Sequence, residues 1–493
     1  MIGMLELFAS RGFFLDRDVF GILSKKSDDE VTEIINGLVK SGVKERVITK
    51  KIFDEYILKL ERKRDGLNIK LLSTPKFLSR KIGVGDFVRY FRSRYEVLSG
   101  MLATGVENMS SIRRIGGGGG VYNIVAMVVK KNITKNKNLL IEVEDLTGRV
   151  VVLVNQDRRD LFDKAKNLML DDVVLFRVSG SGEMLFVNDI IFPDVGLEKE
   201  KYGDVDEYIA FSGDFHVGSR NFLEKDVLRF VDWLNGEVGD ERQRAIARKV
   251  KYLVLVGDMV DGVGVYSGQE GWLNIKDIKG QYKKLGEIFG KIRKDLEIAM
   301  CAGQHDAVWV GEPQKVIPEK WAGELYKMKN LKLVTSPALV DVGGFRILMY
   351  HGASINRFVD ETENIRVNFG HRSPTRVVRE MLRCGHLAPM YGLMDYVLCE
   401  VDPMVIDIVP DIVATGDQHR AEVDCYNNIL MVASSCWQST TPFEERVGNV
   451  PEPCRVPLFN LKTREIKIVD FSEDKIKWEE GDDLVCKLGG ENV

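Results

Sequence analysis

The stretch LVLVGDMVDG, residues 253–262, joins four apolar residues to a glycine-rich acidic turn. The run Leu253–Val256 predicts a short strand, because apolar and β-branched residues bounded by glycine are typical of one. Asp258 and Asp261 follow at once, and the glycines beside them allow a sharp turn and a close approach to a ligand. Alone, the motif is also compatible with an ordinary turn. Whether it marks a functional site depends on the residues that follow the other predicted strands.

Four further apolar runs end in the same kind of polar loop. Ligand sites in α/β sheets lie beyond the carboxyl ends of strands, so we expect these loops to meet. Four of the 6 histidines in the chain fall in them. Each loop by itself is compatible with a surface turn or a hydrogen-bonded core histidine, but together the loops predict one shared site. They are SGDFHVGS at 212–219, AGQHD at 302–306, HGAS at 351–354 and GDQHR at 416–420.

The donor atoms in these loops indicate a metal site. Carboxylate, amide and imidazole groups without a thiolate suit Mn²⁺, or else Fe or Zn, better than a cysteine-type zinc site. One carboxylate can bridge two cations held about 3.5–4 Å apart, and such a pair is suited to phosphoryl transfer. The sequence therefore favours chemistry on a phosphate ester.

Composition bounds the class of protein. A chain of 493 residues is too long for one core and predicts about two or three domains. The formal charge, 70 − 74 = −4, excludes a globally basic nucleic-acid binder but not a local basic groove. No apolar run is long enough to span a bilayer, and we expect no signal peptide. The 7 cysteines form no CxxC pair. We expect reduced thiols, a cytoplasmic location and no membrane partner.

The first part of the chain predicts a helical domain at 1–57, since Ile34, Ile35, Leu38 and Val39 recur at helical spacing. A charged linker and helical segment is expected at 58–115. From about 206 to 472, strands alternate with helical stretches, which predicts a layered α/β domain. The acidic segment 473–493 is expected to be surface or disordered.

Several short β-rich runs between 116 and 200 predict a small barrel of the OB type. The five glycines Gly116–Gly120 precede it as a flexible joint; a phosphate-binding nest is the alternative. Four lysines cluster in the first hairpin and are candidates to contact a nucleic-acid backbone. A solvated loop is equally compatible, and OB folds also serve as protein-docking platforms. The lysines are Lys130, Lys131, Lys135 and Lys137.

The ordered set DxH, GDxxDG, GQHD, a strand-end His-Gly and GDQH resembles the calcineurin-like metallophosphoesterase superfamily over about 206–440. Four more stretches extend the likeness: FRSRY at 91–95, SIRRI at 111–115, RCGHLAP at 383–389 and SSCWQSTTPFEERVGNVPEPCRVP at 434–457. With these, most of the chain resembles the small subunits of archaeal family-D DNA polymerases. That resemblance implies a four-layer α/β/β/α phosphoesterase domain, preceded by an OB barrel and a small N-terminal helical domain.

The resemblance also implies roles for particular residues. The first cation would be held by Asp214, His216, Asp258 and His419, with Asp258 bridging to the second. Gln304, His351 and Asp417 would complete the second site, and His305 would be the catalytic imidazole. The implied activity is a 3′→5′ exonuclease that uses two divalent cations, Mn²⁺ with Mg²⁺ as the alternative. The implied partners are a large catalytic subunit, single-stranded or primer-terminus DNA and, through the holoenzyme, a sliding clamp.

Two positions depart from the family pattern, which reads GNHD and GHxH where this chain has GQHD and GDQH. Both departures, Gln304 and Asp417, fall on the second cation. They support an alternative hypothesis, a catalytically silent scaffold that anchors the large subunit. A free-standing phosphodiesterase is disfavoured, because a barrel and a helical region precede the catalytic part. His371 and His386 receive no functional role.

Overall fold

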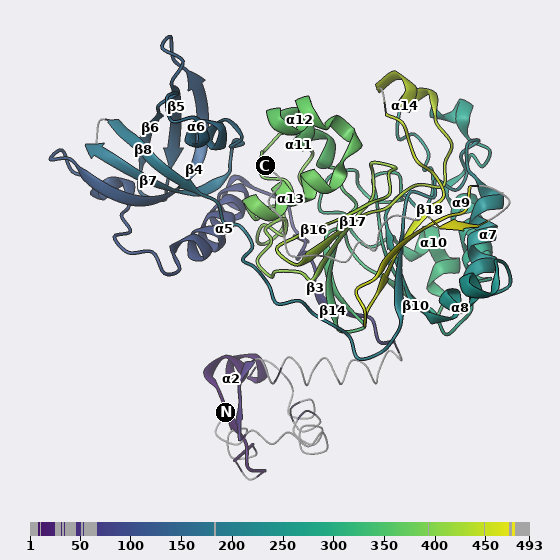
Figure 1. Cartoon of the computed structure of the whole chain (residues 1–493). Coiled ribbons are helices and arrows are strands. Elements are labelled where there is room, and N and C mark those ends of the chain that lie inside the picture. The colour runs from purple at the N-terminus through teal and green to yellow at the C-terminus, as the bar shows by residue number, and fades with distance from the viewer. Residues whose placement is uncertain are drawn as a thin grey trace. The chain divides into compact units, whose positions relative to one another are not determined.

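The computed structural model describes residues 67–472, apart from 182–183, 393 and 448, and residues 476–478. Nearer the N-terminus it describes 8–9, 11–24, 31, 34, 46–50 and 53. The chain divides into two compact units, Met1–Lys70 and Leu71–Val493 (Figure 1).

The first unit has a small apolar core that includes Phe8, Val19 and Ile48. Helix α2 (Arg17–Leu23) begins at Asp16, whose carboxylate accepts a hydrogen bond from the Val19 amide at 2.8 Å. Such a side chain satisfies one of the free amides of a first helical turn. Besides this helix, the short strands β1 (Phe14–Leu15) and β2 (Val47–Ile48) pair in parallel, so the unit is not purely helical as expected. Ile34 is buried, while Ile35, Leu38 and Val39 lie outside the described residues.

The second unit contains a closed five-stranded barrel. Its strands follow the order β4-β5-β6-β8-β7, and β7 pairs with β4 to close it. Only β6 and β8 run parallel; the other neighbouring pairs are antiparallel. Alternate residues point into the barrel core, as in β5, where buried and half-buried side chains alternate. The elements are β4 (Gly120–Ile133), β5 (Leu139–Glu144), β6 (Arg149–Val154), α6 (Arg159–Lys166), β7 (Val173–Ser181) and β8 (Met184–Ile191).

The remainder of the second unit is built on two sheets. The seven-stranded sheet has the order β12-β11-β10-β9-β18-β19-β20, in which β9 to β12 run parallel. Its strands are β9 (Tyr208–Ser212), β10 (Val250–Val256), β11 (Glu297–Cys301), β12 (Leu331–Leu333), β18 (Arg455–Asn460), β19 (Ile466–Asp470) and β20 (Lys477–Trp478). The six-stranded sheet has the order β16-β17-β15-β14-β13-β3, in which β14, β15 and β17 run parallel. Its strands are β3 (Lys70–Ser73), β13 (Ala338–Val342), β14 (Phe345–Met349), β15 (Ile412–Thr415), β16 (Glu422–Tyr426) and β17 (Ile429–Ala433).

Both faces of each sheet are covered (Figure 1). In β10, Leu253 and Leu255 belong to the core formed with the outer helices, whereas Val254 and Val256 are buried on the opposite face. Across the two sheets, the rings of Phe345 and Phe459 lie 5.6 Å apart. The sheets thus stack between outer helices, and the predicted multidomain α/β class is confirmed. Those helices are α7 (Glu224–Leu234), α8 (Glu241–Lys249), α9 (Ile278–Phe289), α10 (Glu319–Tyr326), α11 (Ile355–Glu361), α12 (Glu363–Asn368) and α13 (Pro374–Cys384). Shorter elements are η1 (Ile112–Arg114), η2 (Gln269–Trp272), η3 (Gly370–Arg372) and α14 (Pro442–Val447).

The stretch expected as a linker and helical segment contains β3 and the 20-residue helix α5 (Val84–Ala103). The helix contacts both neighbours. Tyr95 Oη donates to the Val125 carbonyl of the barrel at 2.9 Å, and Arg94 Nε donates to Asp402 at 2.7 Å. Its described part is therefore packed structure that ties the barrel to the two sheets. At the other end of the chain, residues 477–478 pair with β19, and 479–493 lie outside the described residues.

Among the residues that the structure describes, five cysteines are free and buried: Cys301, Cys384, Cys399, Cys436 and Cys454. Cys425 is disulfide-bonded, so the expectation of reduced thiols is wrong for this residue. In the part of the chain that the structure describes, no helix has the length and apolar character to cross a bilayer.

Candidate metal centre

The predicted loops meet at the carboxyl ends of β9, β10, β11, β14 and β15. Three groups of side chains could each hold a metal ion. Within a group, every residue contributes one donor atom, and these atoms lie within 4.8 Å of one another. The groups are Asp214, His216 and His419; His216, Asp258 and His305; and Asp214, Asp258 and His351. Because parallel neighbours end at the same edge and the two sheets face each other, loops far apart in sequence converge on one point.

The two departures from the family pattern lie at the same point. Gln304 Oε1 is 3.0 Å from His351 Nε2, and Asp417 Oδ1 is 3.8 Å from the same nitrogen. The amide of Asp417 donates to both carboxylate oxygens of Asp214 at 3.2 Å. All eight predicted catalytic and metal-binding residues are therefore brought together.

The histidines are held so that one nitrogen faces the centre. His351 Nδ1 donates to the Val256 carbonyl at 2.7 Å, and His305 Nδ1 donates to the Asp261 carbonyl at 2.8 Å. A carbonyl only accepts, so Nδ1 of each ring carries a hydrogen and Nε2 is the nitrogen left to face the centre. His216 Nε2 and His419 Nε2 approach to 3.2 Å. Two such nitrogens are suited to sharing a cation.

Two outer residues, missing from the predicted site, orient these rings. Asp261 Oδ1 lies 3.2 Å from His216 Nδ1, and Glu444 Oε1 lies 2.7 Å from His419 Nδ1. Carboxylates behind metal-binding histidines fix the ring and raise its basicity. Asp261 was visible in the GDMVDG motif, whereas Glu444 stands in the α14 segment PFEERV, which carries no metal-ligand pattern.

The backbone at the site is strained. Five of the predicted residues have positive φ: Asp214 at 50°, His216 at 50°, Asp258 at 51°, Asp417 at 66° and His419 at 56°. Residues other than glycine in this region cost about 1–3 kcal/mol each and cluster at functional sites. Glycine is required beside them, because a Cβ at Gly257 would lie 2.3 Å from His351 Nδ1. The same holds at Gly303, where a Cβ would lie 2.2 Å from Asp258 Oδ1.

The electrostatics of the cluster fit a bound cation. Burial, together with the nearby Asp214 and Asp258 carboxylates, raises the pKa of Asp417 to about 6 against the opposing effect of His351. Burial also acts to raise the pKa of Asp258, but His351 and His305 outweigh it and hold that pKa well below its usual range. Buried carboxylates this close together repel one another unless a positive charge lies between them. The donor set of carboxylates, imidazoles and an amide suits divalent cations such as Mn²⁺ or Mg²⁺.

The centre opens toward solvent over His305. Its side chain is 21% exposed, against 10% for His419, 4% for Asp258 and 0% for His351. A substrate must therefore arrive on the side of the loop that carries His305.

The four barrel lysines differ in exposure and in their hydrogen-bond partners. Lys130, Lys135 and Lys137 are exposed around the β4–β5 hairpin. Lys131 is half-buried and donates to the Lys166 carbonyl at 2.9 Å and to the Leu168 carbonyl. Burial lowers the pKa of its ammonium. Lys131 thus binds the carbonyls that end helix α6, and nucleic-acid contact stays a prediction for the other three.

The two unassigned histidines lie outside the cluster. His386 Nε2 is 3.0 Å from Asp402 Oδ2, and burial together with the Arg94 charge lowers the pKa of His386 to about 4. This neutral, fully buried ring is part of the packing around α5. His371 belongs to the short helix η3.

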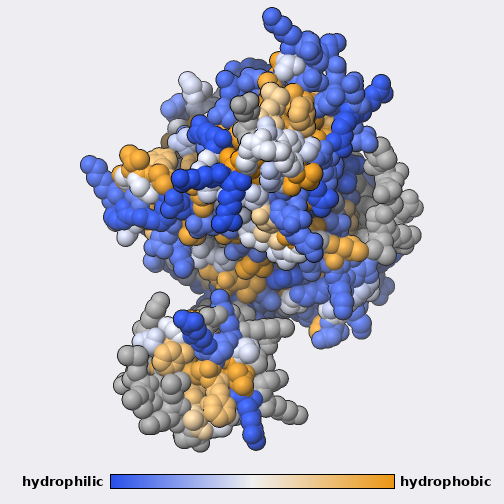
Figure 2. All heavy atoms as spheres, turned by 90° about the vertical axis from the view of Figure 1, so that its left-hand side faces the viewer, coloured by the Kyte–Doolittle hydropathy of each residue, from blue (hydrophilic) through white to orange (hydrophobic). Residues whose placement is uncertain are grey.

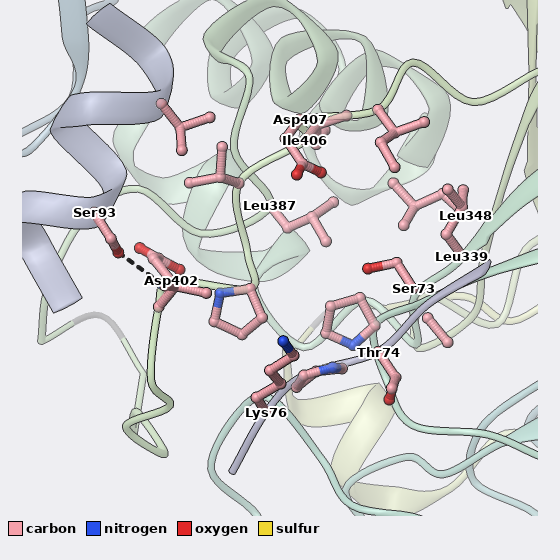
Figure 3. A pocket seen from close by; sticks show the side chains of 18 of the residues that line it. Ser73, Thr74, Lys76, Ser93, Leu339, Leu348, Leu387, Asp402, Ile406 and Asp407 are labelled. Atoms are coloured by element: carbon pink, nitrogen blue, oxygen red, sulfur yellow. Dashed lines mark hydrogen bonds between the residues drawn. The ribbon is translucent and has the colours of Figure 1, made fainter. Parts of the chain in front are cut away.

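A pocket of about 300 Å³ lies away from the centre, between α5, β3 and residues 400–408 (Figure 3). Leu339, Leu348 and Leu387 line it, and Ser93 Oγ accepts a hydrogen bond from the Asp402 amide at 2.9 Å at its side. None of the eight clustered residues lines this pocket, so it is a separate feature of the surface.

Comparison with known proteins agrees with the motif pattern. Residues 209–424 match the family of the B-subunits of DNA polymerases alpha and epsilon. A DNA polymerase II small subunit from Methanothermobacter thermautotrophicus is 34% identical over 484 residues, which cover 94% of this chain and 98% of that protein. One from Archaeoglobus fulgidus is 32% identical over 490 residues, covering 94% and 97%.

Solved structures give weaker likenesses. Vps29 from Entamoeba histolytica complexed with Zn²⁺ is 15% identical, covers 55% of this chain and 97% of its own, and has a TM-score of 0.29. A structure titled as a novel archaeal phosphodiesterase is 13% identical, covers 53% and 98%, and has a TM-score of 0.26. The sequence relatives decide the assignment. With 34% identity across 98% of one relative, this chain belongs to the family of DNA polymerase II small subunits.

Proposed function

We propose that this chain is the proofreading subunit of a replicative polymerase, a metal-dependent 3′→5′ exonuclease acting on DNA phosphodiesters. The observation that carries the proposal is the convergence of three donor groups from five strand-end loops. The two covered sheets support assignment to the calcineurin-like metallophosphoesterases. The barrel order β4-β5-β6-β8-β7, with its single parallel pair, supports an OB fold.

Two cations fit the donors in the arrangement that the resemblance implies. Asp214, His216, Asp258 and His419 would hold the first, with Asp258 also reaching the second. Gln304, His351 and Asp417 would complete the second. Divalent cations bound there would neutralise charge on the phosphate and lower the pKa of the attacking water.

His305 is suited to work on the substrate itself. Its Nδ1 is occupied by the Asp261 carbonyl, so Nε2 faces the opening. Burial lowers the pKa of His305, whereas Asp258 Oδ2, 4.0 Å from that nitrogen, acts in the opposite direction. A protonated Nε2 would hydrogen-bond the phosphoryl oxygen and deliver the proton to the departing 3′ oxygen.

Replacing His305 with alanine should lower digestion of a 3′-labelled single strand in Mn²⁺ by about 10²-fold, because general acid catalysis is lost. The matched control is His371→Ala, since His371 lies outside the cluster, and it should keep the full rate. Equal rates for His305→Ala and the unaltered chain would remove His305 from the chemistry.

A second candidate function, a scaffold that anchors the large polymerase subunit, is favoured by the surface of α5. Residues 84, 87, 88, 91, 95, 98 and 102 form one apolar helix face at i, i+3, i+4, i+7 spacing. The barrel covers Leu98 and Leu102, but Val84 is 82% and Val88 55% exposed. Figure 2 views the side on which α5 and the barrel lie in Figure 1, and apolar groups are visible there among polar ones. Exposed apolar patches of this kind mark protein interfaces.

Val88→Glu should weaken the affinity for the large subunit roughly 30-fold, if this face is central to the interface. Val367→Glu, at a 70% exposed valine of α12, is the matched control. Titration calorimetry with the purified large subunit measures both. Indistinguishable affinities would exclude this face as the anchor. Contacts with primer-terminus DNA belong to the first proposal, and a sliding clamp would be reached through the holoenzyme.

A further inference from the structure

Trp309 is the most exposed of the 6 tryptophans, with 75% of its surface accessible, and Val310 beside it is 56% exposed. Leaving so large an apolar ring in water forgoes the free energy that its burial would provide. The ring is therefore suited to a ligand that covers it.

The position of Trp309 relates it to the metal centre. It lies four residues after His305, a distance of at most about 14 Å along the chain. The start of this loop is fixed: Asp306 accepts hydrogen bonds from the Gly303 amide at 2.9 Å and from Tyr282 Oη at 2.8 Å. The Ala307 amide donates to the same Tyr282 oxygen at 3.0 Å. Trp309 thus follows, within a few residues, a rigidly held segment of the loop that carries His305.

The surroundings of Trp309 combine rings with a positive charge. Lys315 Nζ lies 5.8 Å from the centroid of the Trp309 ring and 5.0 Å from that of Phe77. Lys315 itself is exposed. Aromatic rings that stack on bases, beside a cation that contacts phosphates, are the usual elements of a site for single-stranded nucleic acid.

We propose that Trp309, Lys315 and Phe77 form a subsite for the unpaired strand whose 3′ end enters the centre. The proposal rests on the proposed nuclease function and names its substrate class. A base stacks on Trp309 only when one of its faces is free, which holds in a single strand and not inside a duplex. Lys315 would contact the adjoining phosphate. The subsite therefore selects frayed or mismatched primer ends over paired ones.

The test is binding of 5′-fluorescein oligothymidylates of 2 to 12 nucleotides, followed by anisotropy on the full-length His305→Ala chain without added metal, so that digestion is suppressed. Adding Trp309→Ala should weaken binding of the 12-mer by about 5- to 150-fold, the range for one lost stack of about 1–3 kcal/mol. The loss should grow with strand length, since a 2-mer does not reach the ring. Trp309→Phe should restore most of the affinity, and Trp272→Ala, at a 43% exposed tryptophan, should not weaken it.

Two results would overturn the subsite. One is equal affinity for the 12-mer with and without Trp309→Ala. The other is unchanged DNA affinity together with lost affinity for the large subunit, which would make this surface a protein contact. The binding assay does not depend on catalysis, so a chain without nuclease activity in any metal would refute the proposed function while leaving the subsite to be decided by anisotropy.

Discussion

Replacing Asp258 with asparagine should reduce the Mn²⁺-dependent nuclease rate by on the order of 10³-fold or more, equivalent to about 4 kcal/mol of transition-state stabilisation. Asp258 belongs to two of the three donor groups. Its Oδ2 is 3.4 Å from His351 Nε2, and its Oδ1 accepts the His305 amide at 2.8 Å. An amide in its place keeps the shape but removes the negative charge that two cations would share.

The same substitution should lower the number of bound Mn²⁺ ions, measured by titration calorimetry, which reports on the site even if the chain is a silent scaffold. Asp407→Asn, at an exposed aspartate away from the cluster, should change neither the rate nor the stoichiometry. Full metal binding in the Asp258→Asn chain would contradict the bridging role. Circular dichroism of each variant checks that the substitution has not unfolded the chain.

Replacing Arg94 with alanine should destabilise the second unit by about 3–5 kcal/mol, because it leaves a charge buried without its partner. Arg94 and Asp402 side chains are both 0% exposed, and Nε donates to Oδ2 at 2.7 Å. Burial acts to raise the pKa of Asp402, but the Arg94 charge and the hydrogen bond from His386 outweigh it and hold that pKa well below its usual range. The pair joins helix α5 to the loop that follows α13.

Urea unfolding followed by tryptophan fluorescence measures this effect. Arg92→Ala, at an exposed arginine on the same helix, should change the free energy of unfolding little. Combining Arg94→Met with Asp402→Leu should recover much of the loss, since it removes both charges instead of one. A small effect of Arg94→Ala alone would mean that water reaches Asp402, and that the pair does not hold the helix in place.

The local sequence pattern was sufficient to predict the clustered residues, because each strand and its loop are adjacent in sequence. The run Leu253–Val256 and the glycine and carboxylates behind it stand within ten residues, and the same holds for the AGQHD loop. Because the strands end at a common edge, naming the loops was enough to name the cluster. The family assignment, which rested on those motifs, is confirmed by relatives of 32–34% identity.

Contacts between segments that are distant in sequence could not be predicted from these motifs. Glu444 reaches His419 across 25 residues, and Lys131 reaches the end of α6 across 35 to 37. From the sequence alone, Glu444 cannot be told from an ordinary surface acid, because its partner His419 is contacted only through the position of α14. Lys131 likewise cannot be told from an exposed lysine, because the two carbonyls that it binds are brought to it by the closed barrel.

The sequence by itself determined the eight residues that cluster at the candidate site, because each of them follows directly after a predicted strand. Only the tertiary structure decided how those residues are oriented, which side of the centre is open, and that α5 is packed structure and not a tether. The physical reason is that orientation and exposure depend on long-range packing: the sheets bring the loops together, while partners such as Val256, Asp261 and Glu444 turn each histidine. A sequence pattern shows only which residues are close along the chain, whereas the hydrogen bonds that orient the histidines join residues that are far apart in sequence.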